Sequence, residues 1–175
     1  MNAHSWYAVF TRSNFEKAVT VELDRKGIEA YLPAVKEMHR WKDRRKEVEV
    51  PVFRSYLFAR ITDTPENRLR ILRTTGAIRI LGSGSSITAV HDLEIESIRR
   101  LVSSGREFSR HPYLSEGAWV RVKYGPLEGV EGRLLRIKNR DRLVLSVEIL
   151  ARSVVTEIDG SDVELVARDP RTLVS

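Results

Sequence analysis

Few residues in this 175-residue sequence could support catalysis or metal binding, and their spacing predicts no active site. The absence of cysteine excludes disulfides, thiolate catalysis and zinc–cysteine sites. The histidines His4, His39, His91 and His111 stand at no spacing typical of metal ligands. No serine lies in a nucleophile elbow, and solvation explains the acidic residues on expected helix faces and strand ends. We therefore predict a protein that is not an enzyme and holds no metal or cofactor.

Basic side chains offer a different chemistry, the binding of phosphate. The chain has a net charge of +6, and one short segment is strongly basic around a tryptophan. Its residues of interest are Arg40, Trp41, Lys42, Arg44, Arg45 and Lys46. Such a basic first half suggests proximity to nucleic acid or to an acidic partner. A solvated hairpin tip accounts for the same charges, so both interpretations stay open.

The elements that would position these residues alternate between strands and helices in the first half. Aromatic and β-branched runs predict strands, and periodic apolar residues predict helices. Ser13 and Glu16 are spaced as a capping box at the start of the first helix, and Gly27 would end it. The predicted order is strand 6–11, helix 13–27, strand 30–33, basic hairpin around 36–46, strand 56–61, helix 64–75, strand 77–81, loop 82–86 and helix 92–103.

The second half has the composition of a small barrel. Residues 106–115 are polar and aperiodic, which predicts a linker between domains 1–105 and 116–175. Five short strands are expected at 118–122, 130–137, 143–149, 154–158 and 163–166. The first turn carries three residues suited to tight geometry, with a further glycine in the next strand. These are Gly125, Pro126, Gly129 and Gly132.

Nothing in the sequence predicts a membrane segment. No apolar run approaches the roughly 18 residues that a spanning helix needs. The first residues lack the basic and apolar regions of a signal peptide. We expect a cytoplasmic monomer.

Two segments in this order resemble the NusG family of transcription elongation factors. The first comprises Trp6-Tyr7-Ala8-Val9-Phe10, Phe15-Glu16-Lys17, Tyr31-Leu32-Pro33 and residues 53–58. The second, residues 120–132, looks like a KOW motif. Some ribosomal proteins also carry that motif, so a ribosome- or RNA-binding protein without a polymerase role is the alternative. The resemblance implies an α+β N-terminal domain, with a mostly antiparallel sheet flanked by helices, linked to a small all-β SH3-like KOW barrel.

The resemblance also implies that the N-terminal domain binds RNA polymerase at the clamp coiled coil of the β-prime subunit. It would bridge the polymerase cleft and suppress pausing or termination. The matching aromatic residues are Phe10, Phe53, Tyr56 and Phe58. Strand alternation places Tyr56 and Phe58 on one face, which is either core or partner surface. Specialised members contact the opposing jaw through a His-Thr-Thr-like element, from which the matching Asn67, Arg68 and Leu69 depart.

Further partners follow from the same resemblance. The basic hairpin would lie near upstream DNA or nascent RNA, where its lysines and arginines would contact phosphates without reading sequence and Trp41 could stack on an exposed base. The KOW domain would recruit a small-subunit ribosomal protein or the termination factor Rho through a loop containing Leu150 and Arg152. Housekeeping members have phenylalanine at the position of Leu150, so these departures favour a specialised antiterminator paralogue.

Overall fold

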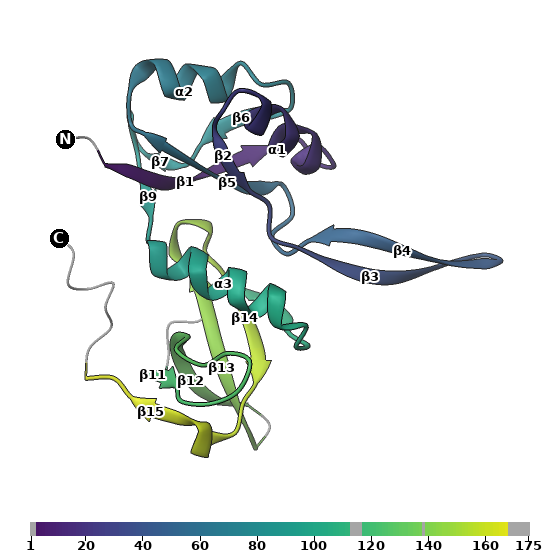
Figure 1. The fold of residues 1–175 in the computed structure, drawn as a ribbon, viewed down its shortest axis with the longest axis vertical. Coiled ribbons are helices and arrows are strands. Elements are labelled where there is room, and N and C mark those ends of the chain that lie inside the picture. The colour runs from purple at the N-terminus through teal and green to yellow at the C-terminus, as the bar shows by residue number, and fades with distance from the viewer. Residues whose placement is uncertain (1–2, 113–116, 138, 168–175) are drawn as a thin grey trace. The chain divides into compact units, whose positions relative to one another are not determined.

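The computed structural model describes residues 3–112, 117–137 and 139–167, and the chain divides into two compact units (Figure 1). The first unit comprises residues 1–89 and the second residues 90–175. The first contains 16 Lys/Arg and 10 Asp/Glu, whereas the second contains 14 of each. The net charge of +6 therefore belongs entirely to the first unit.

An antiparallel sheet forms the centre of the first unit, with strands in the order β2-β5-β1-β6 and β9 also paired to β1. These strands are β1 (His4–Thr11), β2 (Glu29–Tyr31), β5 (Tyr56–Thr62), β6 (Ala77–Ile80) and β9 (Ala89–Val90). Helices α1 (Glu16–Arg25) and α2 (Pro65–Leu72) pack on one face of this sheet. The core between them consists of Tyr7, Val9, Val19, Leu23, Ile28, Leu57, Ala59, Ile61 and Ile71.

Two hairpins complete the first unit. β3 (Ala34–Trp41) and β4 (Arg44–Pro51) form a separate two-stranded ribbon that extends away from the sheet, as predicted (Figure 1). β7 (Gly82–Ser83) and β8 (Ser86–Ile87) pair where the sequence predicts a loop. Gly84 permits this second turn because its φ is +60°.

The two helix starts in this unit differ in how well the sequence predicts them. The hydroxyl of Thr64 accepts a hydrogen bond from the Asn67 amide, so the predicted cap of α2 is confirmed. The predicted capping box of α1 is wrong, since Phe15 is the N-cap residue and makes no side-chain cap. Glu16 instead is buried and accepts a hydrogen bond from the Ser55 amide at 2.7 Å. The Glu16 carboxylate, which the sequence spacing places in a capping box, therefore binds a backbone amide 39 residues away in the chain.

The second unit is an antiparallel sheet with one helix, in the strand order β10-β14-β13-β12-β11-β15. Its elements are α3 (Asp92–Ser104), β10 (Ser109–Pro112), β11 (Ala118–Val122), β12 (Glu131–Ile137), β13 (Arg140–Val147), β14 (Arg152–Glu157) and β15 (Val163–Leu165). Short 3-10 turns, η1 (Glu148–Leu150) and η2 (Gly160–Asp162), connect the last strands. The all-β region fits a KOW domain, and the α+β and all-β fold classes are confirmed.

Helix α3 belongs to the second unit, whereas the sequence analysis places it within residues 1–105. Its buried residues Ile95, Ile98 and Leu101 lie on the side that packs against β12 and β13. The Glu148 amide donates to Glu94 Oε1 at 3.2 Å, and Arg100 Nη1 donates to the Glu128 carbonyl at 2.8 Å. An apolar stripe predicts a helix, but it does not identify the sheet that the helix covers.

Part of the predicted linker is also a strand. Within β10, Ser109 lies opposite Val155 and Arg110 lies opposite Val154 in β14. The Thr156 hydroxyl further donates to the Glu107 carbonyl at 2.7 Å. Because this pairing uses the backbone, it needs no apolar pattern that sequence reading could detect. The rest of the predicted linker, residues 113–116, lies outside the described residues.

Candidate interaction surfaces

The face of the first unit's sheet opposite α1 and α2 is aromatic. Phe10 pairs with Tyr56 across β1 and β5, and Ala8 pairs with Phe58. Successive side chains alternate between the faces of a strand, so these residues point away from the core that the two helices cover. We call the following six residues the aromatic face: Trp6, Phe10, Tyr31, Phe53, Tyr56 and Phe58.

The four aromatic residues that the family resemblance assigns to polymerase binding differ in their solvent exposure. Phe10 and Tyr56 are half-buried, with ring centroids 5.3 Å apart. Phe53 is 4% exposed and Phe58 is fully buried. Phe58 lies 6.4 Å from the Phe53 ring and 6.4 Å from the Tyr31 ring. Phe10 and Tyr56 are therefore available for contact, whereas Phe53 and Phe58 are buried.

Two arginines flank this aromatic face. The guanidinium of Arg79 lies 5.7 Å from the Phe10 ring, and that of Arg60 lies 5.8 Å from the Trp6 ring. Both arrangements are of the cation–π type. Trp6 is not among the residues predicted to bind the polymerase, although the alternation Trp6-Ala8-Phe10 places it on the same strand face as Phe10.

The beginning of α2 is held by contacts within the chain. Asn67 Nδ2 donates to the Thr62 carbonyl at 3.0 Å. Arg68 donates to both oxygens of Asp63 and to the Ser85 carbonyl. The hydrogen bond from Arg68 lowers the pKa of Asp63, and the same contact raises the pKa of Arg68. A partner that engaged Asn67 and Arg68 would have to compete with these contacts.

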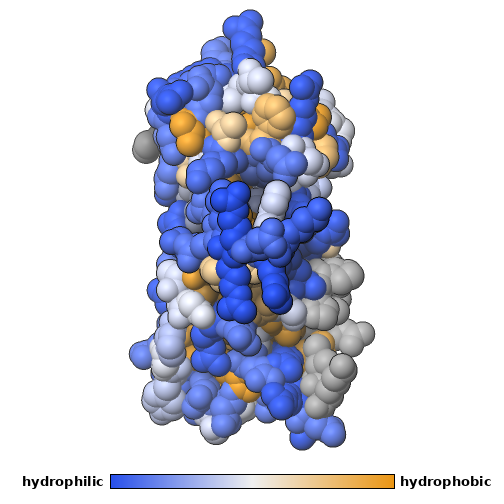
Figure 2. All heavy atoms as spheres, turned by 90° about the vertical axis from the view of Figure 1, so that its right-hand side faces the viewer, coloured by the Kyte–Doolittle hydropathy of each residue, from blue (hydrophilic) through white to orange (hydrophobic). Residues whose placement is uncertain are grey.

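The β3–β4 hairpin separates its charges along its length. Near the base, Lys36 pairs with Glu47 at 2.8 Å, and Lys17 of α1 pairs with Glu49 at 2.9 Å. The tip carries the predicted basic residues, all exposed: Arg40, Lys42, Arg44, Arg45 and Lys46. None of these five side chains makes a hydrogen bond or ion pair with another described residue. The hairpin extends to the right in Figure 1, and Figure 2, which views the molecule from that side, shows mostly hydrophilic residues at its centre.

Cross-strand register gives the hairpin tip one face with an exposed indole. Trp41, which is 69% exposed, lies opposite Arg44, and His39 lies opposite Lys46. Alternation places these four side chains on the same face. An aromatic ring beside cations is the arrangement that binds unpaired bases and their phosphates.

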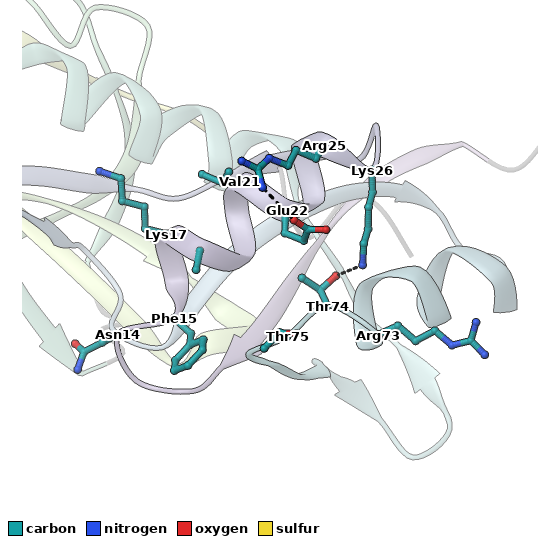
Figure 3. A pocket seen from close by; sticks show the side chains of 11 residues that line it. Asn14, Phe15, Lys17, Val21, Glu22, Arg25, Lys26, Arg73, Thr74 and Thr75 are labelled. Carbon is teal, nitrogen blue, oxygen red and sulfur yellow. Dashed lines mark hydrogen bonds and ion pairs between the residues drawn. The ribbon is translucent and has the colours of Figure 1, made fainter.

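A groove with a volume of about 670 Å³ lies between α1 and the segment 73–75 in the first unit (Figure 3). Phe15, Ala18 and Val21 line it with apolar atoms. Around them lie the cationic side chains Lys17, Arg25, Lys26 and Arg73 and the carboxylate of Glu22. No local sequence signal indicates this groove, because its two sides are about fifty residues apart in the chain.

The glycines of the predicted KOW motif are needed for two different structural reasons. Gly125 and Gly129 have φ values of +87° and +80°, which favour glycine. Gly132 lies in β12, where a Cβ atom would come within 2.6 Å of the Val144 carbonyl oxygen. Pro126 is exposed between the first two glycines. The turn therefore needs glycine for its backbone angles, and the strand needs it for space.

The predicted partner loop of the second unit has one buried and one exposed member. Leu150 is 5% exposed within η1, whereas Arg152 is exposed at the start of β14. Elsewhere on the sheet, Arg121 of β11 pairs with Glu131 at 2.6 Å, and this contact raises the pKa of Arg121. Arg152 is therefore the accessible residue of the predicted pair.

The described part of the chain offers neither a metal site nor a membrane span. Among residues 3–112, 117–137 and 139–167, no three histidine or acidic side chains are grouped closely enough to hold a metal ion. No helix within these ranges has the length and apolar character needed to cross a bilayer.

Comparisons with known proteins identify related sequences along nearly the whole chain. A family model described as "Transcription termination factor nusG" matches residues 4–99. The "Transcription termination/antitermination protein NusG" of Borreliella burgdorferi is 25% identical over 186 residues, covering 94% of this chain and 100% of the relative. The protein of the same description from Halalkalibacterium halodurans is 23% identical over 175 residues, covering 93% of this chain and 98% of the relative.

One solved structure supports the fold. It is described as "Domain interaction in Thermotoga maritima NusG" and matches with a TM-score of 0.50 and 24% sequence identity. The match covers 94% of this chain and 98% of that chain.

Proposed function

This chain belongs to the NusG family of transcription termination and antitermination factors, and on that premise we propose that its first unit binds RNA polymerase through the aromatic face. The proposed target is the clamp coiled coil of the β-prime subunit. Binding there would hold the clamp closed across the polymerase cleft and suppress pausing or termination. The factor would be a specialised antiterminator paralogue that acts as a monomer.

The pair of Phe10 and Tyr56 is the observation that carries this proposal. Aromatic side chains that are partly exposed and rigidly supported are typical hot spots of protein–protein interfaces. Phe58, two residues after Tyr56 on β5, and Phe53, which packs edge-on against Phe58, are buried parts of the same aromatic face. Arg79 beside Phe10 adds a polar rim, as is common around such anchors.

The hairpin tip is proposed to contact upstream DNA or nascent RNA. Its five cations are exposed on the unit that carries the whole net charge, and Trp41 is the exposed aromatic residue among them. Contacts of this kind add affinity and orientation without sequence specificity. They would align the clamp-bound unit along the nucleic acid.

The second unit is proposed to recruit a small-subunit ribosomal protein or Rho, with exposed Arg152 at the contact. Its net charge of zero favours a protein partner over a purely electrostatic RNA contact. Because both units belong to one chain, binding of the first would raise the local concentration of the second near the polymerase.

A binding measurement with purified RNA polymerase tests the proposal. Replacing both Phe10 and Tyr56 by alanine should weaken binding by at least about tenfold, because both removed rings are contact anchors. The control is Tyr124→Ala, which removes an exposed aromatic ring from the second unit. Equal binding by the wild type and the double variant would refute the proposed surface.

Transcription assays in vitro over a pause and a terminator, with and without Rho, test the activity. The wild type should increase read-through, and the double variant should not. Read-through that does not change when the wild-type protein is added would refute antitermination even if the polymerase is bound.

A further inference from the structure

The groove beside α1 has no role in the function proposed above. We infer that it binds an acidic segment of RNA polymerase that carries an apolar side chain, as a second protein contact of the first unit. This inference rests on the proposed function, since it assumes that the first unit docks on the polymerase.

The floor of the groove provides the apolar part of this site. Ala18 and Val21 of α1 continue the three-residue spacing that begins at its N-cap Phe15, and Val21 is 43% exposed. Figure 3 shows Phe15 at the N-cap of α1 and Val21 on the helix, with Thr74 and Thr75 on the neighbouring segment. The volume of about 670 Å³ is within the range of sites that enclose whole side chains.

The rim provides charge of one dominant sign. Four cations and one carboxylate line the groove, which gives it a net charge of +3. Three of the cations are engaged: Lys17 with Glu49 at 2.9 Å, Arg25 with Glu22 at 3.6 Å and Lys26 with the Thr74 hydroxyl at 2.8 Å. The guanidinium of Arg73 makes no hydrogen bond or ion pair with any described residue. An acidic side chain next to the apolar anchor would therefore find a cation that has no competing partner.

These features favour a protein segment over nucleic acid. A phosphate backbone repeats its charge and needs a row of free cations, whereas the described lining of this groove offers one free cation beside an apolar floor. The hairpin tip of the same unit has five cations without such partners among the described residues, so it is the better site for phosphates. Charge complementarity and the apolar floor together select an acidic segment with one apolar anchor.

The internal contacts of α2 explain why a second polymerase contact would use this groove. Bridging a cleft requires two surfaces on the first unit. Asn67 and Arg68, which the family resemblance assigns to the opposing jaw, are held by Thr62, Asp63 and Ser85. The groove is a separate surface of the same unit with chemistry suited to a protein.

Site-specific photo-crosslinking in reconstituted elongation complexes tests this inference. A benzophenone amino acid is placed at Val21 in the full chain, at Leu72 as a matched control and at Tyr56 to report docking. Val21 and Leu72 are both helical, apolar and 43% exposed, but only Val21 lines the groove. We expect crosslinks to a polymerase subunit from positions 21 and 56 and none from position 72.

Several results would overturn the inference. Crosslinking of position 21 to DNA, to RNA or to a second copy of the chain would contradict the proposed occupant. Crosslinking from position 56 alone would show that the groove is empty in the docked complex. The absence of crosslinks from both positions would refute the proposed function itself, and the inference with it.

Affinity measurements give a second readout that does not depend on crosslinking chemistry. Val21→Glu should weaken binding to the polymerase by about tenfold, because it places a carboxylate against an acidic partner and removes the apolar contact. Leu72→Glu should leave the affinity within about twofold. Circular dichroism would verify that both variants fold. Equal affinities for the two variants would contradict the groove contact.

Discussion

Replacing Ile98 by alanine should loosen the second unit and leave the first unit intact. Ile98 is 1% exposed in α3, and α3 packs against β12 and β13. Truncation of a buried isoleucine to alanine costs about 2–5 kcal/mol, because apolar burial decreases and a cavity remains. The surroundings cannot relax fully here, because buried Ile95 and Leu101 occupy the adjacent turns of the same helix.

Hydrogen exchange followed by mass spectrometry measures this effect segment by segment. Where exchange proceeds through unfolding of the whole unit, a destabilisation of about 2–5 kcal/mol speeds exchange by a factor of about 30 to 5,000. We expect faster exchange in peptides from residues 131–147 and unchanged exchange in peptides from β1 and β5. Ile71→Ala is the matched control, because Ile71 is the same residue type and is fully buried in α2 of the first unit.

The control should give the reverse pattern, with faster exchange in β1 and β5. If Ile98→Ala instead accelerated exchange in β1 and β5 and spared residues 131–147, α3 would belong to the first unit. That result would refute the boundary at residue 89 and support the range 1–105 predicted from the sequence.

Three further predictions concern other features of the two units. Gly132→Ala should destabilise the second unit by about 1–3 kcal/mol in urea denaturation, since the added Cβ meets the Val144 carbonyl oxygen. Gly125→Ala should cost only about 1 kcal/mol, because Gly125 has open space around it but a φ of +87°. If Gly125→Ala were the more destabilising variant, the steric role given to Gly132 would be wrong. Arg68 lowers the pKa of Asp63, so this pair stabilises the fold above the ordinary aspartate pKa and loses that contribution as pH falls through the lowered value. Asp63→Asn should therefore flatten the dependence of stability on pH below about pH 5, and an unchanged acid-unfolding curve would argue against the pair. Replacing Arg40, Arg44, Arg45 and Lys46 by glutamine should weaken nucleic-acid binding. The slope of log affinity against log salt concentration should decrease in magnitude by about 0.7–0.9 for each phosphate that the variant no longer neutralises. An unchanged slope would place the nucleic acid elsewhere on the protein.

The sequence predicts most of the fold because many elements carry local signals. Thr64 and Pro65 mark the start of α2, and Gly105 ends α3 with a φ of +68°. Alternating aromatic and aliphatic residues identify β1 and β5. Gly125 and Gly129 locate the turn of the second unit through the backbone angles that only glycine adopts freely.

The remaining features depend on contacts between distant segments. Ser13 and Glu16 have the spacing of a capping box, yet the amide of Ser55 binds the carboxylate. β10 forms through backbone pairing with β14, which side-chain patterns do not encode.

The candidate interaction surfaces are also only partly predictable from the sequence. Phe10, Phe53, Tyr56 and Phe58 are all recognisable from the sequence. Their division into a half-buried pair, Phe10 and Tyr56, and a buried pair, Phe53 and Phe58, follows only from the tertiary packing of these rings. The groove required the proximity of α1 to residues 73–75, for which the sequence has no local signal.

The boundary at residue 89 has a consequence for the order of events during synthesis. Every element of the aromatic face precedes it, and the 86 residues of the second unit are still to be added when that face is complete. At about 5–20 residues per second, a ribosome needs roughly 4–17 s to add them. Small mixed α/β domains fold faster than all-β domains, which need milliseconds to seconds, so the first unit has time to fold while the chain is still growing. The surface proposed to hold the polymerase would thus mature before the module proposed to recruit its second partner.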